Sequence, residues 1–196
     1  MQITWFHPLA RALVVSLAAA WRRRARRPVR RESDLVSVLG EPVLAARPER
    51  ETALRALCGQ LLEHWFVGGR AVLPVVSVGS GEGRTRIAKQ LAAMFRQMGV
   101  RTLLVDADVR ASRQWRLERL AGPEVPAYIA AAAQRYRVVL IDTPAAARGP
   151  DLQLFAALAG GALVIAKERD MKELSFLKEL LKPAKAKVVA TVFTPG

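Results

Sequence analysis

The sequence predicts an α/β fold with about five mainly parallel strands and helices on both faces. Short apolar runs alternate with amphipathic helical segments, which is the pattern of a parallel sheet whose strands are joined by helices. One apolar run meets a glycine-rich turn, and two others end in aspartate. The expected strands lie near residues 72–77, 101–106, 137–142, 161–166 and 187–193.

Composition favours a folded intracellular domain with a separate basic segment before it. The chain has 196 residues, of which 52% are hydrophobic, enough for one α/β domain with a full core. Its only cysteine, Cys58, excludes a disulfide framework, and we expect this thiol to be buried in a helix. We divide the chain into residues 1–50, a membrane-proximal segment, and residues 51–196, a nucleotide-binding domain.

The first predicted strand leads into the residues that suggest phosphate binding. The turn GSGEGRT is followed by a predicted helix from Thr85 to Met98. Glycines allow several backbone N–H groups to converge on one anion, and the helix N-terminus adds its dipole. The pattern GxxxxGK[ST] fails at Val78, which replaces its first glycine, and at Arg84, which replaces its lysine. The candidate nucleotide-binding residues are Gly79, Ser80, Gly81, Glu82, Gly83, Arg84 and Thr85.

Two further strands bring carboxylates toward the same edge of the sheet. The run RTLLVDADVR ends in Asp106 and Asp108, and RVVLIDTPA ends in Asp142. Ligands of parallel α/β sheets bind beyond the carboxyl ends of the strands, so these acids should face the glycine-rich turn. We expect all three to act on metal, water or an acceptor hydroxyl. For Mg²⁺ bound with ATP or ADP, the expected protein ligands are Thr85, Asp106 and Asp142.

The first 50 residues combine an apolar stretch with a dense basic run. Residues 3–21 are mostly apolar, and seven arginines follow between Arg22 and Arg31. A transmembrane helix, a helix lying in the membrane interface and a soluble helix packed on the domain are all compatible with this order. The net charge of +14 suits an anionic partner, and the adjoining apolar stretch favours lipid over nucleic acid. We therefore expect this segment to associate with a membrane, with its arginine run on the cytoplasmic side.

Several stretches resemble one family of bacterial proteins. The peptide SDLVSVLGEPVLAARP resembles the cytoplasmic exit segment of polysaccharide co-polymerases. The loop from Gly79 to Thr85, with LLVDADVR and VVLIDTP, resembles the bacterial tyrosine kinases (BY-kinases) and their EpsG-like chain-length branch. That family lies within the MinD/ParA-like class of P-loop NTPases, and the resemblance implies a place at the cytoplasmic face of the bacterial inner membrane. The resemblance implies bound Mg-ATP, kinase or ATPase activity, co-polymerase or export partners, and a role in exopolysaccharide or capsule biosynthesis.

The sequence also departs from this family. Only residues 109–141 separate Asp108 from Asp142, a shorter interval than the family has. The family's ring-assembly pattern E-x-x-R-x-x-R aligns with Thr52, Arg55 and Cys58, so homo-oligomerisation stays an open expectation. No tyrosine cluster precedes the final residue. Three functions therefore remain open: an active BY-kinase-like protein, a non-catalytic regulatory subunit of the same system, and a MinD/ParA-type partitioning ATPase.

Overall fold

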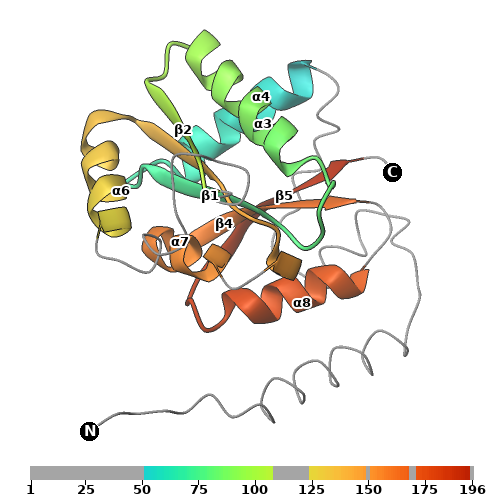
Figure 1. Cartoon of the computed structure of the whole chain (residues 1–196). Coiled ribbons are helices and arrows are strands. Elements are labelled where there is room, and N and C mark those ends of the chain that lie inside the picture. The colour runs from blue at the N-terminus through green and yellow to red at the C-terminus, as the bar shows by residue number, and fades with distance from the viewer. Residues whose placement is uncertain (1–50, 108–123, 149–150, 168–170, 195–196) are drawn as a thin grey trace, which may run out of the picture.

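The computed structural model describes residues 51–107, 124–148, 151–167 and 171–194, and they form the expected α/β layers. A 5-stranded sheet has the strand order β2-β3-β1-β4-β5, and every pairing is parallel (Figure 1). The strands are β1 (Val72–Ser77), β2 (Thr102–Asp106), β3 (Val138–Asp142), β4 (Gly161–Lys167) and β5 (Lys187–Thr194). This confirms the predicted fold class, and the predicted strand bounds agree within one residue.

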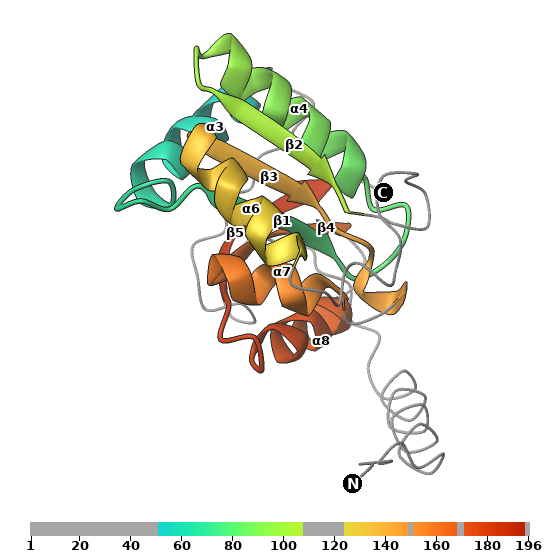
Figure 2. The same ribbon diagram turned by 60° about the vertical axis from the view of Figure 1, so that its left-hand side comes forward.

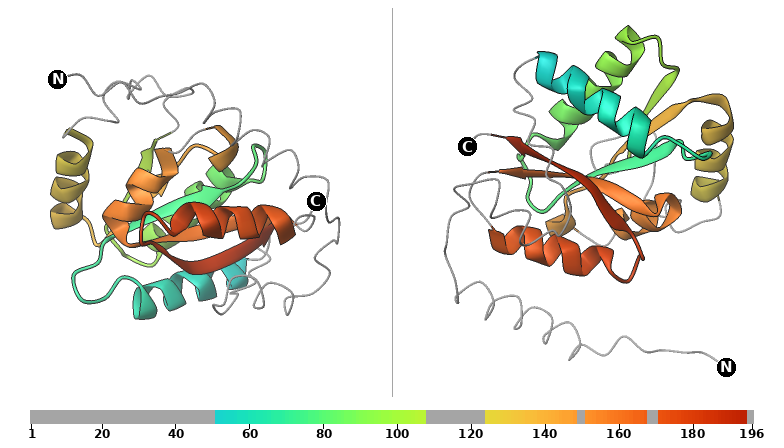
Figure 3. Two further views of the ribbon diagram at one scale, coloured as in Figure 1. Left: turned by 90° about the horizontal axis from the view of Figure 1, so that it is seen from below. Right: turned by 180° about the vertical axis from the view of Figure 1, so that it is seen from behind.

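Helices cover both faces of the sheet. They are α3 (Glu51–His64), α4 (Arg84–Gln97), α6 (Glu124–Arg135), α7 (Asp151–Ala159), α8 (Met171–Leu181) and the short 3-10 helix η1 (Ala146–Arg148). Alternate strand residues point to opposite faces, so Leu73 and Val75 pack under α3 and α4, whereas Val76 packs with α7 and α8. Figures 1 and 3 show these two helical layers on either side of the sheet.

The topology places β1 at the centre of the sheet. From β1 the chain crosses to β2 on one side, and from β3 it crosses back over β1 to β4 on the other side. Such a reversal of strand order opens a crevice at the carboxyl ends of the strands. The turn after β1 therefore lies where a parallel sheet binds its ligand, between the ends of β3 and β4.

The helix after the glycine-rich turn begins one residue earlier than predicted, at Arg84. Its buried face carries Ile87, Leu91 and Phe95, as the sequence pattern indicated. The ring of Phe95 meets the ring of Phe66 edge-on, with centroids 5.7 Å apart. This contact joins α4 to the turn after α3, so the helix that precedes β1 is an integral part of the domain.

Cys58 is fully buried in α3, as expected. Burial raises the pKa of its thiol to about 12, so the group stays a neutral thiol near pH 7. Residues 1–50 and Asp108 lie outside the described residues. Within the described ranges, no helix is long and apolar enough to cross a membrane.

Substitutions at two glycines, one in β4 and one in α3, test the packing of the sheet against Trp65 in the turn after α3. A Cβ at Gly161 would lie 2.7 Å from Trp65 Cη2 and 3.0 Å from the backbone carbonyl of Lys187. At Gly59, inside α3, a Cβ would meet nothing within 4 Å. We expect Gly161→Ala to lower the free energy of unfolding by about 1–3 kcal/mol through overpacking. Gly59→Ala should raise it by roughly 0.5–1 kcal/mol, because alanine favours the helix. Urea denaturation measures both, and equal changes would contradict the packing described.

Candidate phosphate-binding site

The turn between β1 and α4 has the backbone of an anion-binding loop. Gly81 and Gly83 have φ values of 77° and 84°, a left-handed conformation that glycine adopts without steric cost. Gly83 is also the N-cap of α4, and this N-cap forms no side-chain capping hydrogen bond. A helix N-terminus without a side-chain cap favours an anion through its first N–H groups and its dipole.

A carboxylate of the loop already occupies one of its backbone donors. The Gly79 N–H donates to Glu82 Oε1 over 2.7 Å, and Glu82 is only 7% exposed. A Cβ at Gly79 would lie 2.7 Å from the same oxygen, so a larger residue there would force the Glu82 carboxylate to move. An anionic oxygen thus lies against the loop backbone in the way that a phosphate oxygen would.

Arg84 turns inward, toward the end of β3. Its Nε donates to Asp142 Oδ1 over 2.9 Å, and its Nη1 donates to Ser77 Oγ over 2.7 Å. The Ser77 hydroxyl in turn lies 3.0 Å from the carbonyl oxygen of Gly79, to which it donates. The side chains of Arg84 and Asp142 are 9% and 5% exposed, so the ion pair is shielded from water. One guanidinium therefore connects the start of α4 with the carboxyl ends of β1 and β3.

The double contact explains why arginine is well suited to this position. A guanidinium presents several N–H donors in a fixed plane and can reach two acceptors at once. A lysine ammonium at the same position is a compact charge on a flexible stem and would not reproduce this planar geometry. The replacement of lysine by arginine in the loop is thus accommodated by the two acceptors Ser77 and Asp142.

Threonines at two other strand ends hold the frame around the loop. The Thr194 hydroxyl, at the end of β5, donates to the Glu82 carbonyl oxygen over 3.0 Å. The Thr143 hydroxyl, just after β3, donates to the Val75 carbonyl oxygen over 2.9 Å. Both threonines are buried. The loop is therefore fixed to β5 through its backbone and to β3 through Arg84.

Two of the three predicted carboxylates lie side by side. Asp106 and Asp142 are register partners at the ends of β2 and β3, whose parallel arrows Figure 2 shows. Asp106 is exposed, whereas Asp142 is buried against Arg84. The third carboxylate, that of Asp108, lies outside the described residues. Thr85, the expected hydroxyl ligand, is exposed in the first turn of α4.

These residues fit a nucleotide that arrives with Mg²⁺. The Gly79 N–H of the loop donates a hydrogen bond to an anionic oxygen, that of Glu82. Among the described residues, no group of three or more His, Cys, Asp and Glu side chains could hold a metal alone. Mg²⁺ commonly takes one or two protein carboxylates and completes its shell with water and substrate phosphates. Thr85, Asp106 and Asp142 could supply that protein share once Asp142 is released from Arg84.

Sequence reasoning found the loop and its carboxylates but missed the partners that fix them. The sequence pattern predicts Ser77 only as the last residue of a buried strand, although a hydroxyl at the end of an apolar run is a usable signal for a site. The bond from Thr194 to the loop joins residues 112 positions apart, and no local pattern indicates it. The sequence motif also does not predict that the Arg84 side chain points inward, because a motif gives the position of a residue and not the direction of its side chain.

Comparison with known proteins gives structural matches alone. No protein-family model matches the sequence, and no curated protein matches it. The kinase domain of the Escherichia coli tyrosine kinase ETK is similar in structure, with a TM-score of 0.66 and 18% identity over 88% of this chain and 83% of that chain. The BceF tyrosine kinase domain has a TM-score of 0.64 and 19% identity, covering 95% and 89% respectively.

A third structure, of the chimerical protein CapA2B2, has a TM-score of 0.71 and 19% identity over 84% of this chain and 98% of that chain. These structural neighbours are domains of the family that the sequence motifs resemble. At such identities the likeness establishes a shared fold.

The buried ion pair makes a direct prediction for stability. Arg84→Gln leaves the Asp142 carboxylate buried without its cation, and breaking a buried pair typically costs about 3–5 kcal/mol. The double variant Arg84→Gln/Asp142→Asn removes both charges and should regain a large part of that loss. Arg86→Gln, an exposed neighbour in the same turn, should change stability by less than about 0.5 kcal/mol. The free energies of unfolding of the wild type, the single variants Arg84→Gln and Asp142→Asn, and the double variant give the coupling energy. A coupling energy near zero would contradict the pair.

Proposed function

We propose that this chain binds ATP and ADP with Mg²⁺ as a BY-kinase-like protein of exopolysaccharide or capsule biosynthesis or export. The observation that carries the proposal is the loop after β1, whose Gly79 N–H already binds an anionic oxygen beside an uncapped helix N-terminus. The fold shared with the tyrosine kinase domains of ETK and BceF supports it. So does the order of the three motifs along the chain.

Binding of a nucleotide requires two rearrangements in the loop. A phosphate oxygen must displace the Glu82 carboxylate from the Gly79 N–H, because one donor cannot serve both. Arg84 must then exchange its contact with Asp142 for a phosphate oxygen, to which a guanidinium binds well. The exchange frees the Asp142 carboxylate at the moment when the phosphates arrive. Nucleotide binding and Asp142 release are thus coupled steps.

Turnover of the nucleotide depends on the roles that Asp106 and the released Asp142 then take. Mg²⁺ bound with the nucleotide would neutralise charge on the phosphates, held by Thr85, Asp106 and Asp142. Asp106 is already exposed at the neighbouring strand end and could orient water or an acceptor hydroxyl. In phosphoryl transfer, most of the catalytic effect comes from positioning and charge stabilisation. The chain's own contribution is to hold these groups at adjacent strand ends.

A non-catalytic regulatory subunit is the second candidate, and the Arg84–Asp142 pair favours it. Each turnover would have to break and reform a buried ion pair, which slows a catalyst but suits a nucleotide-dependent switch. The position of Tyr136 also argues against autophosphorylation of that residue. Tyr136 precedes Asp142 by six residues, about 20 Å along β3, so it lies at the opposite edge of the sheet. Tyr128 is 38% exposed on α6, so it is the more accessible acceptor.

The first 50 residues support a proposal for the place of the protein in the cell. We propose that this segment associates with anionic lipid at the cytoplasmic face of the inner membrane. Co-polymerase or export proteins would be its partners, and chain-length regulation its role. The support is the apolar stretch followed by Arg22–Arg31 and the resemblance of residues 33–48 to a co-polymerase exit segment.

Calorimetric titration with Mg-ADP tests the proposed function. We expect binding by the wild-type chain and a loss of binding in Gly83→Val. A valine side chain strains the left-handed backbone there (φ 84°), and its Cβ would lie 3.6 Å from Thr194 Cγ2. Glu82→Gln should bind Mg-ADP roughly tenfold more tightly. In the wild type, a phosphate must displace the Glu82 carboxylate from a charge-assisted hydrogen bond of about 1.5 kcal/mol, and the variant lacks that competing charge.

Glu63→Gln is the matched control for Glu82→Gln. It removes the same charge from an exposed position at the far end of α3, so its affinity should equal that of the wild type. Absence of any heat change with wild-type protein at millimolar Mg-ADP would refute nucleotide binding. Weaker binding by Glu82→Gln would show instead that Glu82 supports the loop.

A further inference from the structure

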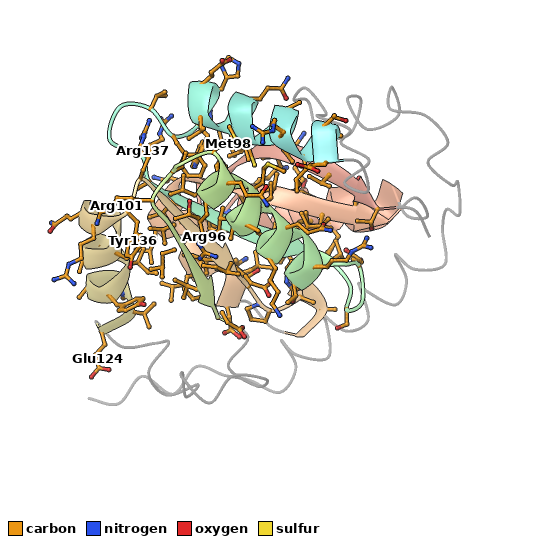
Figure 4. All side chains as sticks on the ribbon, turned by 90° about the horizontal axis from the view of Figure 1, so that it is seen from above. Arg96, Met98, Arg101, Glu124, Tyr136 and Arg137 are labelled. Carbon is orange, nitrogen blue, oxygen red and sulfur yellow. The ribbon has the colours of Figure 1, made fainter. Side chains whose placement is uncertain are left out.

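Basic residues stand at or just before the start of four of the five strands. Arg101, Arg137, Arg70 and Lys187 precede or begin β2, β3, β1 and β5 respectively. We call these four side chains the amino-edge patch. They lie at the edge of the sheet opposite the phosphate-binding loop, because all strands are parallel. Figure 4 shows Arg101 and Arg137 on the same side of the molecule, next to Tyr136.

Backbone hydrogen bonds fix the order of the patch along the edge. The N–H groups of Arg137 and Val138 donate to the Arg101 carbonyl oxygen over 3.0 and 3.2 Å. The Val139 N–H donates to the carbonyl oxygen of Ala71, the residue after Arg70. Neighbouring strands lie about 4.8 Å apart, so the patch extends over roughly 20 Å from β2 to β5.

Aromatic rings beneath the patch hold three of its cations along the edge. The Arg70 guanidinium carbon and Lys187 Nζ lie 5.1 and 5.7 Å from the Trp65 ring centroid. The Arg101 guanidinium carbon lies 6.0 Å from the Tyr136 ring centroid. All four patch residues are exposed, and none of the ion pairs among the described residues includes them. Their charges thus face solvent without a carboxylate partner in the described part of the chain.

The helix ends next to the patch add further positive charge. Helices run opposite to the strands here, so their last turns lie at the same edge. Exposed basic residues near these ends are Arg96, Arg135, Lys182 and Lys185. The acids at these ends are Glu63 and Glu179, each beside a basic partner: His64 at 3.9 Å for Glu63, and Lys182 for Glu179. Glu82, Asp106 and Asp142 lie at the opposite edge together with Arg84, Arg86 and Lys167, so acidic and basic residues are mixed there, whereas basic residues are in excess at the amino edge.

Exposed apolar side chains accompany the basic residues. Val67 is 40% exposed in the turn between α3 and β1, and Leu158 is 42% exposed in the last turn of α7. Both positions border the amino edge of the sheet. Val67 is followed by Gly68 and Gly69, whose positive φ values of 58° and 83° form the turn that presents it. The edge therefore combines unpaired cations with protruding apolar groups.

We propose that the amino edge of the sheet docks the domain onto an anionic lipid bilayer. A row of cations on a straight edge matches a planar surface of headgroups, and protruding apolar side chains can enter the interface between headgroups and acyl chains. Nucleic acid would leave Val67 and Leu158 without a favourable environment. The inference deepens the proposed membrane association by assigning the orientation of the domain: the phosphate-binding loop faces away from the bilayer.

The orientation can be measured on the full chain with a dye at one position. Val67→Cys is labelled with nitrobenzoxadiazole, and a second protein carries the dye at Ala147→Cys, an exposed position of η1 at the opposite edge. Cys58 stays unlabelled, because it is fully buried and its thiol pKa is about 12. Fluorescence is recorded with vesicles of phosphatidylcholine, alone or mixed with phosphatidylglycerol, and sedimentation reports vesicle binding separately.

Charge variants show whether the patch causes the docking. Arg101→Gln/Arg137→Gln removes two patch charges, and Arg55→Gln/Lys89→Gln removes two exposed charges from α3 and α4 as the matched control. Each basic side chain near an anionic surface contributes about a fivefold factor, so the patch variant should weaken the affinity reported at Val67 by roughly 30-fold. The control should lose much less.

We expect the Val67 dye to brighten several-fold and shift to the blue only with phosphatidylglycerol, while the Ala147 dye stays unchanged. A silent Val67 dye on protein that sediments with vesicles would overturn the proposed orientation and leave membrane association by residues 1–50 intact. Failure to sediment would overturn both, without bearing on nucleotide binding. Duplex DNA that binds more tightly than the vesicles, and through Arg101 and Arg137, would assign the patch to nucleic acid and overturn the proposal.

Discussion

The buried ion pair between Arg84 and Asp142 is the contact on which the rest of the site depends. It joins the first residue of α4 to the last residue of β3 and, through Ser77, to the end of β1. A charge taken out of water must be matched by its partner, so the position of Arg84 fixes where the Asp142 carboxylate can lie. Two groups of the loop are thus bound to carboxylates of the chain: the Arg84 guanidinium to Asp142, and the Gly79 N–H to Glu82. Any phosphate must compete with these internal anions, and the strength of that competition decides between a catalyst and a switch.

The parallel sheet gives the two edges of the domain different chemistry. All strands begin at one edge and end at the other, so residues that start strands gather apart from those that finish them. In this chain the strands finish at Ser77, Asp106, Asp142, Lys167 and Thr194, whereas a basic residue stands at or just before the start of four of the five strands. The rings of Trp65 and Tyr136 contact cations only at the amino edge. Basic residues are therefore in excess at the amino edge, and the proposed orientation of the domain at an anionic surface follows from this excess.

The fold was predictable because its signals are local. Strand segments such as Leu103–Val105 and Val139–Ile141 are apolar runs, and the apolar residues on the buried face of α4 recur every three or four positions. The candidate site was predictable in position because parallel strands end together, which brings Asp106 beside Asp142. Side-chain direction was not predictable. Whether Arg84 points to the loop mouth or to β3 depends on the hydroxyl of Ser77 and on the balance of desolvation and pairing, and no spacing in the sequence encodes that balance.

The proposed nucleotide binding requires Arg84 to leave Asp142 when the phosphates arrive. Nitrogen-15 NMR of arginine side chains tests it most directly, because a buried, hydrogen-bonded Nε–H exchanges slowly and gives a resolved signal. The Arg84→Lys variant assigns this signal by its loss, and exposed Arg86 provides the reference. We predict that Mg-ADP shifts the Arg84 Nε–H resonance markedly and leaves that of Arg86 less affected. Binding of Mg-ADP with an unchanged Arg84 signal would contradict this exchange, because the ion pair between Arg84 and Asp142 would then persist in the nucleotide-bound state.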